Sequence, residues 1–326
     1  MKAIRQRMFG GPDVLGIEEV PDPQPREGEV RIRVESAGVH LLDTVIRRGQ
    51  GNARVMPALP MTPGREVAGV VDKVGVGVDS GLLGRRVVAD LGSASGGYAE
   101  LALASVGSLH DVPDDVDPDQ AVTMIGTGRT AMAILELAEP GAHDVALVTA
   151  AAGGIGSLLV QAASAAGAQV VAAAGGPAKT ALAHDLGAAI TVDYLKDEWA
   201  ERVLVELHGQ GPTLVLDGVG GEIGRVAMGL LGVGGRLVMY GSASGTLIPL
   251  TAEDLYRLGI TAGAAIGARI LQRAGGLRDL ETKALQAVAD GVLRPVIGQR
   301  FPLADAREAH VAIESRSTTG KTVLRP

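Results

Sequence analysis

The sequence predicts an α/β protein in which a doubly wound parallel sheet is inserted into an all-β region. Three observations support this prediction. Short apolar runs separated by Gly and Pro dominate residues 1 to about 120. From about residue 120, apolar runs of strand length alternate with helix-length segments. After about residue 268 the chain returns to mixed helix and strand, which suggests that the tail completes the first region.

The N-terminal region is predicted to form short strands joined by loops. Residues 30–35 alternate apolar and charged side chains, the period of a strand with one buried face. Residues 67–74 and 86–89 are further runs of strand length. The loops between them are marked by Pro21, Pro23, Pro25, Pro57, Pro60 and Pro63. Such strands indicate a barrel or a sandwich rather than βαβ units.

The middle of the chain has the pattern of a buried parallel sheet. The expected helices cover 120–138, 157–166 and 222–231. The expected strands cover 145–149, 169–174, 214–217, 236–241 and 260–266. This order places a ligand beyond the carboxyl ends of the strands.

The tail is expected to add elements to the first region. The expected elements are a helix at 279–290, an extended segment at 300–303, a helix at 304–315 and a strand at 321–324. The simplest topology is a barrel interrupted by the parallel-sheet domain.

A turn of small residues joins the first strand of the parallel sheet to the next helix. Its sequence is Ala151-Ala152-Gly153-Gly154-Ile155-Gly156, close to the G-x-G-x-x-G pattern but with alanine at the first glycine. Small residues let a pyrophosphate approach the backbone, and the helix N-terminus offers unpaired N–H groups to it. The order strand, turn, helix and strand predicts a nucleotide site here rather than close packing alone.

Composition and charge narrow the class of partner. The net charge is −7 and the basic residues are scattered, which argues against nucleic acid. The chain has no cysteine, which excludes disulfides, thiolate catalysis and zinc sites with Cys ligands. Residues 145–178 carry no charged side chain, but their glycines fit a buried sheet better than a membrane span. Since no signal peptide is apparent, we expect a cytoplasmic protein.

Several ordered motifs carry a family resemblance. They are Gly64-Arg65-Glu66, Gly96-Gly97-Tyr98-Ala99-Glu100, the turn at 151–156 and the tail segments 301–306 and 320–324. Together they resemble the zinc-independent quinone oxidoreductase (zeta-crystallin-like) branch of the medium-chain dehydrogenase/reductase superfamily, over nearly the whole chain. The resemblance implies a GroES-like β-barrel catalytic domain with an inserted Rossmann nucleotide-binding domain. The expected segments are 1–119 and 269–326 for the catalytic domain and 120–268 for the NADPH-binding domain.

The predicted cofactor is NADPH. An NAD site usually has an acid about 20 residues after the glycines, whereas this chain has none between Asp144 and Asp185. It has Gly175 there, followed by Lys179, which can pair with a 2′-phosphate. The resemblance implies that Lys179, Tyr194 and Arg316 hold this phosphate. The alternative is that Lys179 is a solvated helix residue and Tyr194 a packing residue.

Further cofactor contacts are expected beyond other strand ends. Val219 and Gly220 follow one predicted strand, and Gly241 and Ser242 follow the next. The resemblance adds Thr130, which matches a threonine placed beside the nicotinamide.

No metal site is expected. His40 and Glu66 are compatible with a metal, but a catalytic zinc needs three protein ligands, and the third is absent where zinc alcohol dehydrogenases supply it. We therefore expect Glu66 to pair with a basic group inside its domain.

The candidate catalytic residues are His40, Asp43 and Arg129. Asp43 fits the family pattern, whereas His40 replaces an asparagine and Val45 a tyrosine. His40 is interpreted either as a donor of a hydrogen bond or proton to a reduced oxygen or as a hydrogen-bonded residue of the cleft wall. Arg129 is interpreted either as attracting an anionic substrate or, preferably, as a surface arginine.

The resemblance implies an NADPH-dependent quinone oxidoreductase, and a quinone suits hydride transfer without a metal. One alternative is a reductase of α,β-unsaturated carbonyls, either enals and enones or enoyl thioesters. Another is an NADPH-binding protein without enzyme activity, including an RNA-binding one. The resemblance also implies a homodimer paired through residues 260–266, since an open sheet edge must be covered or paired.

Overall fold

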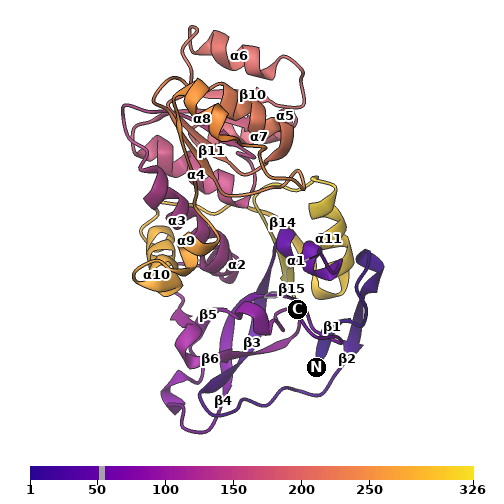
Figure 1. Ribbon diagram of the computed structural model, residues 1–326. Helices are drawn as coiled ribbons and strands as arrows, with labels where there is room; N and C mark the ends of the chain where they lie inside the picture. Colours follow the sequence, from indigo (N-terminus) through magenta and orange to yellow (C-terminus); the bar gives the residue numbers. More distant parts are fainter. Residues whose placement is uncertain (51–55) are drawn as a thin grey trace. The chain divides into compact units, whose positions relative to one another are not determined.

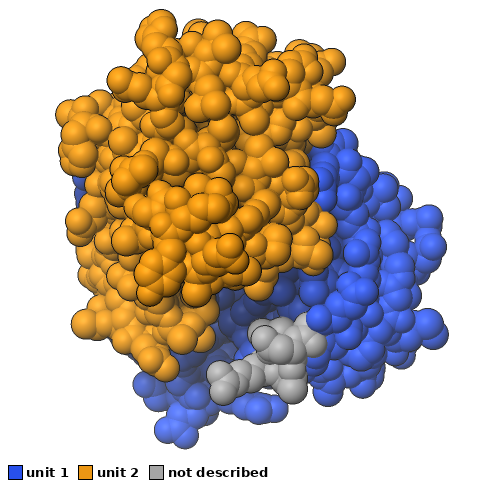
Figure 2. All heavy atoms as spheres, turned by 45° about the horizontal axis from the view of Figure 1, so that its top comes forward, with its two compact units in different colours: residues 1–126, 284–326 blue, residues 127–283 orange. Residues whose placement is uncertain are grey.

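A computed structural model describes residues 1–50 and 56–326, which form two compact units (Figure 1). Unit 1 comprises Met1–Gly126 and Ala284–Pro326, and unit 2 comprises Thr127–Lys283, as coloured in Figure 2. Unit 1 is therefore built from both ends of the chain, and unit 2 is an insertion in its sequence.

A seven-stranded sheet is the framework of unit 1. Its path is β14-β15-β3-β4-β5-β7, and β6 pairs with β3 beside this path. The strands are β3 (Glu29–Val39), β4 (Glu66–Val74), β5 (Arg86–Asp90), β6 (Leu101–Ser105), β7 (Leu109–Asp111), β14 (Ile297–Pro302) and β15 (Lys321–Arg325). Because β15 lies antiparallel to β3, the tail completes the sheet that the N-terminal part begins, as the sequence predicts.

The strand β3 is central to this sheet because it pairs with β4, β6 and β15. Val30, Ile32 and Val34 are buried along one face, which confirms the predicted alternation. Gly69 of β4 lies so close to β3 that a Cβ there would come within 2.0 Å of the Arg33 carbonyl oxygen. The register of the two strands therefore requires a glycine at this point.

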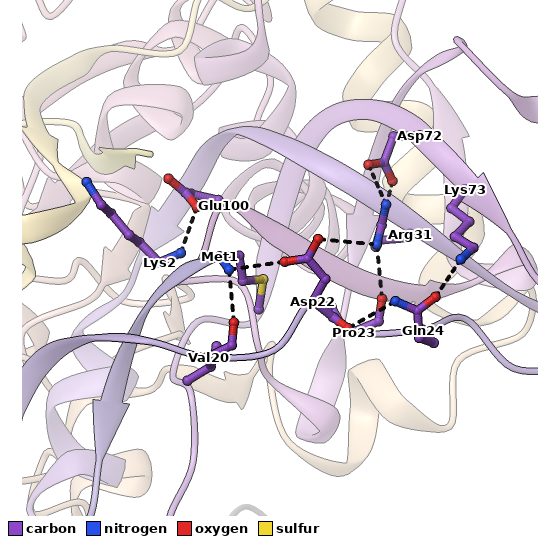
Figure 3. A network of polar contacts seen from close by, with 10 residues as sticks. All are labelled: Met1, Lys2, Val20, Asp22, Pro23, Gln24, Arg31, Asp72, Lys73 and Glu100. Atoms are coloured by element: carbon purple, nitrogen blue, oxygen red, sulfur yellow. Dashed lines mark hydrogen bonds and ion pairs between the residues drawn. The ribbon is translucent and has the colours of Figure 1, made fainter.

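Polar contacts link the N-terminal segment to the rest of unit 1 (Figure 3). A two-stranded sheet of β1 (Lys2–Gln6) and β2 (Leu15–Glu19) is followed by an extended segment. The Met1 ammonium lies 3.1 Å from Asp22 Oδ1, and Arg31 Nε donates to Asp72 Oδ1 at 2.8 Å. Arg31 Nη1 also lies 3.9 Å from Asp22 Oδ2, which links the segment to β3. Partly exposed pairs of this kind contribute at most about 1 kcal/mol each.

A six-stranded parallel sheet forms the centre of unit 2, in the order β10-β9-β8-β11-β12-β13. The strands are β8 (Val145–Thr149), β9 (Gln169–Ala174), β10 (Ile190–Asp193), β11 (Leu214–Asp217), β12 (Arg236–Met239) and β13 (Thr261–Ala264). The first strand lies in the middle of the order, the arrangement of a doubly wound sheet. The sequence prediction missed β10, which has four residues and only two apolar ones.

The apolar runs of this sheet are buried on both faces. On one face, Leu147, Val171, Val215 and Leu237 lie in register and are at most 1% exposed. On the other face, Val148 and Leu216 lie in register and are fully buried. Each such side chain stabilises the fold by about 1.5–3 kcal/mol. The helix α4 (Gly154–Ala165) packs on β8 and β9, and α7 (Gly221–Gly229) packs on β8 and β11.

The predicted helix over 120–138 is confirmed, but its middle turn is π-helical. The chain forms α2 (Pro118–Thr123), a π-helical segment at Met124–Gly128 and α3 (Arg129–Ala138). Glycine is a poor helix former, and the segment contains Gly126 and Gly128. A Cβ at Gly126 would lie 2.1 Å from Glu66 Oε2, so a buried carboxylate occupies the space beside this turn.

The remaining α-helices have between 4 and 14 residues. They are α1 (Leu41–Arg47), α5 (Pro177–Asp185), α6 (Trp199–Glu206), α8 (Ala252–Leu258), α9 (Ala268–Leu271), α10 (Gly276–Ala289) and α11 (Ala306–Glu314). Within the described residues, none of the helices has both the length and the hydropathy that a membrane span requires.

An ion pair joins the amino ends of the central strands of unit 2. Asp144, just before β8, is fully buried and lies 2.7 Å from Arg236 Nη2 at the start of β12. The Thr213 hydroxyl donates to Asp144 Oδ1 at 2.7 Å, just before β11. Burial opposes ionisation of Asp144, but Arg236, Thr213 and the Gly141 amide outweigh it and lower its pKa to about 2. One carboxylate thus connects three strands.

We predict that Asp144→Asn destabilises the protein. It leaves the Arg236 guanidinium without its counter-ion, and breaking a buried pair costs about 3 kcal/mol. Urea denaturation followed by circular dichroism measures the change. Glu201→Gln on the exposed face of α6 is the control and should change stability by less than about 0.5 kcal/mol. Equal stability of the two variants would show that the ion pair does not hold these strands.

Candidate functional site

The turn between β8 and α4 has the features of an anion-binding site. Gly153 is the N-cap of α4, has an extended backbone and makes no side-chain cap. The first N–H groups of a helix have no acceptor within it, so those of Gly154, Ile155 and Gly156 are available to a ligand. The turn is tight, because a Cβ at Gly156 would lie 2.2 Å from the Ala150 carbonyl oxygen.

The alanine at the first glycine of the pattern has a structural explanation. The residue in the left-handed region is Ala150, with φ 49°, and not Ala151. Ala151 is buried and donates its backbone N–H to the Ala173 carbonyl oxygen at 3.2 Å. Ala152 is also buried at 2% exposure. The methyl groups of Ala151 and Ala152 are therefore buried and leave the space at the N-terminus of α4 open.

The residues expected at a 2′-phosphate lie around the end of β9. A Cβ at Gly175 would meet the Tyr194 ring at 3.2 Å, and Lys179 lies in the first turn of α5. Lys179 and Tyr194 are both half-buried. Unit 2 thus brings Gly175, Lys179 and Tyr194 to one corner, whereas Arg316 belongs to unit 1, where it is exposed and has φ 57°.

The sequence analysis missed Asp193 at this corner. Its carboxylate accepts from the Gly176 amide at 2.9 Å and the Leu195 amide at 3.0 Å. The Gly176 hydrogen bond is the main reason that the pKa of Asp193 is lowered. Asp193 thus supports the turn at Gly175 and Gly176 from the end of β10, a strand that the sequence pattern does not predict.

The residues after β11 and β12 lie at neighbouring strand ends, as predicted. Val219 is buried at 2% exposure, and Gly241 and Ser242 are half-buried. Gly241 packs on the first of these loops, since a Cβ there would lie 2.5 Å from the Gly218 carbonyl oxygen. The carboxyl edge of the sheet therefore brings together the turn at 151–156 and both loops.

Arg129 and Thr130 begin α3 and are half-buried. Arg129 Nη1 donates to Glu281 Oε1 at 2.8 Å, with side chains that are 17% and 7% exposed. The preferred interpretation of Arg129 as a surface arginine is therefore wrong. It pairs with a distant acid of the same unit, which sequence spacing cannot show.

In unit 1, His40, Glu66 and Lys321 form a cluster of ionisable groups. His40 Nε2 lies 2.8 Å from Glu66 Oε1 and 3.0 Å from Lys321 Nζ, and Lys321 Nζ also donates to Glu66. Glu66 and Lys321 are buried, whereas the His40 side chain is 29% exposed. Burial opposes ionisation of Glu66, but His40 and Lys321 outweigh it and lower its pKa to about 2.

This geometry confirms that Glu66 pairs with a basic group inside its domain. The sequence analysis missed its partner Lys321, because β15 joins β3 only in the folded sheet. A Cβ at Gly38 would lie 1.8 Å from Glu66 Oε1, so the carboxylate is enclosed by backbone. Among the described residues, no group of three or more His, Cys, Asp or Glu side chains is arranged to hold a metal ion.

Asp43 connects His40 to a second buried cluster in unit 1. Its Oδ2 accepts from the His40 amide at 2.8 Å and from the Tyr98 hydroxyl at 3.1 Å. Tyr98 Oη lies 3.3 Å from His310 Nε2, and His310 Nδ1 lies 3.1 Å from Arg47 Nη1. Asp43 thus fixes the start of α1, where His40 is the N-cap.

We predict that His310 makes the stability of the protein depend on pH. Burial lowers its pKa to about 4, below the 6.5 of an exposed histidine. As pH falls, His310 is protonated near pH 6.5 in the unfolded chain but only near pH 4 in the folded protein. The stabilisation that neutral His310 gives the folded state is therefore full above pH 6.5 and is lost as pH falls from 6.5 through 4. The loss is about 3 kcal/mol.

Urea denaturation between pH 7 and pH 4 measures this loss. His310→Asn should be less stable at pH 7 but show a shallower decline toward pH 4. His143→Asn is the matched control, because the His143 side chain is 79% exposed. If His310→Asn and wild type decline equally, the buried neutral state of His310 is refuted.

Comparisons with known proteins cover both units. Residues 26–114 match the alcohol dehydrogenase GroES-like domain, and residues 154–279 match the zinc-binding dehydrogenase domain. A 2-haloacrylate reductase of Burkholderia is 34% identical over 97% of this chain and 96% of its own length. The solved Thermus thermophilus quinone oxidoreductase, described together with its NADPH complex, has a TM-score of 0.82 and 35% identity, with both chains fully covered.

A quinone oxidoreductase of Pseudomonas aeruginosa is 35% identical over 100% of this chain and 99% of its own length. Identity of this extent covers the sheet of unit 1, the parallel sheet of unit 2 and the returning tail. The chain therefore belongs to the quinone oxidoreductase branch of the medium-chain dehydrogenase/reductase superfamily.

Proposed function

We propose that this protein is an NADPH-dependent quinone oxidoreductase. The observation that carries the proposal is the carboxyl edge of the parallel sheet, where the open N-terminus of α4 lies beyond β8 and Lys179 and Tyr194 lie beyond β9 and β10. An anion site followed by a glycine where NAD enzymes have an acid, with Lys179 in the next helical turn, fits a phosphorylated dinucleotide. The quinone oxidoreductase from Thermus thermophilus, with its NADPH complex, agrees with this choice.

In the proposed cofactor site each residue has a defined role. The amides of Gly154, Ile155 and Gly156 bind the pyrophosphate, while Ala152 and Gly153 keep the approach open. Lys179, Tyr194 and Arg316 bind the 2′-phosphate, with Gly175 leaving room for the ribose. Val219, Gly241, Ser242 and Thr130 contact the nicotinamide half.

Bound NADPH supplies a hydride, and the protein must orient the acceptor and supply a proton. We assign the acceptor side to His40, because its side chain is the exposed member of its cluster. Glu66 and Lys321 hold its Nε2, and Asp43 holds its backbone N–H. His40 then donates a hydrogen bond or proton to the oxygen that becomes negative as hydride arrives.

The state of Arg129 favours a neutral acceptor. An arginine already paired with Glu281 attracts an anionic acyl thioester less than an unpaired one. A quinone accepts hydride without such an anchor. The alternatives are reduction of enals, enones or enoyl thioesters and, in a different class, NADPH binding without catalysis.

The assembly and domain roles are also proposals. We assign acceptor binding to residues 1–119 and 269–326 and NADPH binding to 120–268. The strand β13 is the last strand in the order of the parallel sheet, so residues 260–266 are available to pair with a second copy. We propose a cytoplasmic homodimer without nucleic-acid or membrane partners.

The decisive experiment measures NADPH and NADH oxidation with quinones, 2-enals, enones and enoyl thioesters, with product identification. Hydroquinone formed with NADPH is the expected result. Saturated products from enals or thioesters would transfer the protein to the first alternative. Saturable NADPH binding with no turnover of any acceptor would support the second.

We predict that Lys179→Ala selectively weakens NADPH use. Removing a charge-assisted contact costs about 1.5–3 kcal/mol, which is roughly a 10- to 100-fold rise in the KM for NADPH. The KM for NADH should not change, because NADH lacks the 2′-phosphate. Arg202→Ala on exposed α6 is the control. Equal effects on both cofactors would remove Lys179 from the phosphate site.

We predict that His40→Leu lowers kcat for quinone reduction by roughly 10²-fold, since a positioned donor contributes at least that much. His40→Asn restores a hydrogen-bond donor and should lose much less. The Kd for NADPH should be the same in both variants and wild type. A His40→Leu enzyme with wild-type kcat would assign His40 to the wall of the site alone.

A further inference from the structure

Two Thr–Asp bridges join β8 to β11, one at each end of the strands. At the amino ends the Thr213 hydroxyl donates to Asp144 at 2.7 Å. At the carboxyl ends the Thr149 hydroxyl donates to Asp217 at 2.6 Å. Each threonine hydroxyl also accepts a backbone N–H at 3.0 Å, from Val145 and Gly218 respectively. The two bridges have the same chemistry and lie on opposite edges of the sheet.

The two bridges differ in charge compensation. Asp144 is paired with Arg236. Asp217 is fully buried, and its oxygens accept from neutral donors, which are the Thr149 hydroxyl and the amides of Val219 at 3.2 Å and Gly220 at 2.9 Å. No cationic side chain in the described ranges, 1–50 and 56–326, forms an ion pair with Asp217.

A charged group that is buried without a counter-ion lowers the stability of a protein. At the amino ends of the same strands, Asp144 has such a counter-ion in Arg236. Asp217 therefore differs from Asp144 in having no cationic partner for its carboxylate among the described residues. Since the Thr149 hydroxyl accepts from Gly218, its own hydrogen points to Asp217. The two oxygens of Asp217 thus act as acceptors in all three hydrogen bonds, the pattern of a carboxylate.

Asp217 also determines the shape of both loops beyond the strands. It binds two consecutive amides of the first loop, at Val219 and Gly220. The second loop is attached to the first, because Ala243 and Ser244 donate to the carbonyl oxygens of Gly218 and Val219 at 3.1 and 2.8 Å. The Tyr240 hydroxyl donates to the Thr149 carbonyl oxygen at 3.1 Å, where the phosphate turn begins.

We propose that Asp217 is a positioning residue for the nicotinamide half of the cofactor and that its uncompensated charge favours the oxidised, cationic ring over the reduced, neutral one. The inference rests on the proposed function. In the reaction the C4–H bond of NADPH breaks, the hydride with its electron pair joins the quinone, and a proton completes the hydroquinone. A fixed negative charge under the loops that hold the ring stabilises the positive charge that develops there.

The test is a set of dissociation constants, measured by calorimetry, for NADPH, NADP⁺ and 2′,5′-ADP with wild type, Asp217→Asn and Thr149→Val. Asp217→Asn should raise the Kd for NADP⁺ by roughly tenfold more than the Kd for NADPH, because the substitution removes the carboxylate charge. Thr149→Val keeps the Asp217 carboxylate and removes both hydrogen bonds of the hydroxyl, the one to Asp217 and the one from Gly218, so it should weaken the binding of both dinucleotides equally. Both variants should bind 2′,5′-ADP as wild type does, since this fragment has no nicotinamide.

Asp144→Asn is the matched control, because it removes the compensated carboxylate at the other end of the same strands. It should lower thermal stability without changing the ratio of the NADP⁺ and NADPH constants. If Asp217→Asn does not fold, Thr149→Val provides the test. The inference is overturned if Thr149→Val weakens the binding of NADP⁺ and NADPH unequally, or if it weakens the binding of neither.

Three outcomes separate the claims. An unchanged NADP⁺/NADPH ratio in folded Asp217→Asn overturns the electrostatic role, and an equal loss of 2′,5′-ADP shows a collapsed site and overturns the positioning role. Wild-type protein that binds none of the three ligands overturns the proposed function itself.

Discussion

The place of β8 in the middle of the parallel sheet is the constraint on which the functional architecture depends. Because β8 has the parallel neighbours β9 and β11, its carboxyl end lies between theirs. The chain continues from β8 to β9 on one side of the sheet order, and the later strands β11 and β12 lie on the other side. The turn before α4 and the loops after β11 and β12 therefore meet at one edge. Buried side chains of β8, β9 and β11 make this edge rigid, and small residues at its turns leave the backbone accessible.

In unit 1, backbone packs closely around a buried carboxylate, that of Glu66. Glu66 lies against Gly38 and Gly126, where any side chain would collide with its carboxylate. Its charge is balanced by Lys321 from the last strand, so the tail contributes to stability and to the acceptor side of the proposed site. His40 is the member of this cluster that reaches solvent, because the two other side chains are enclosed.

A basic partner distinguishes two buried carboxylates, Asp144 and Glu66, from Asp217. Asp144 and Glu66 each have a basic partner, and that partner lowers the pKa of each to about 2 in spite of burial. Asp217 is equally buried but is held by a hydroxyl and amides. In a protein that belongs to an oxidoreductase family, such a group is informative, because catalytic electrostatics require charges that the fold has not neutralised.

The sequence by itself determined the alternation of strands and helices, the small-residue turn at 151–156 and the family, because these depend on local periodicity and on residues near one another in the chain. Tertiary structure alone decided the partners of the charged groups. Lys321 reaches Glu66, and Glu281 reaches Arg129, only after strands and helices far apart in sequence pack together. The π-helical turn at Met124–Gly128 was likewise hidden, since a carboxylate from β4 occupies the space beside it. Local propensity carries no information about such neighbours.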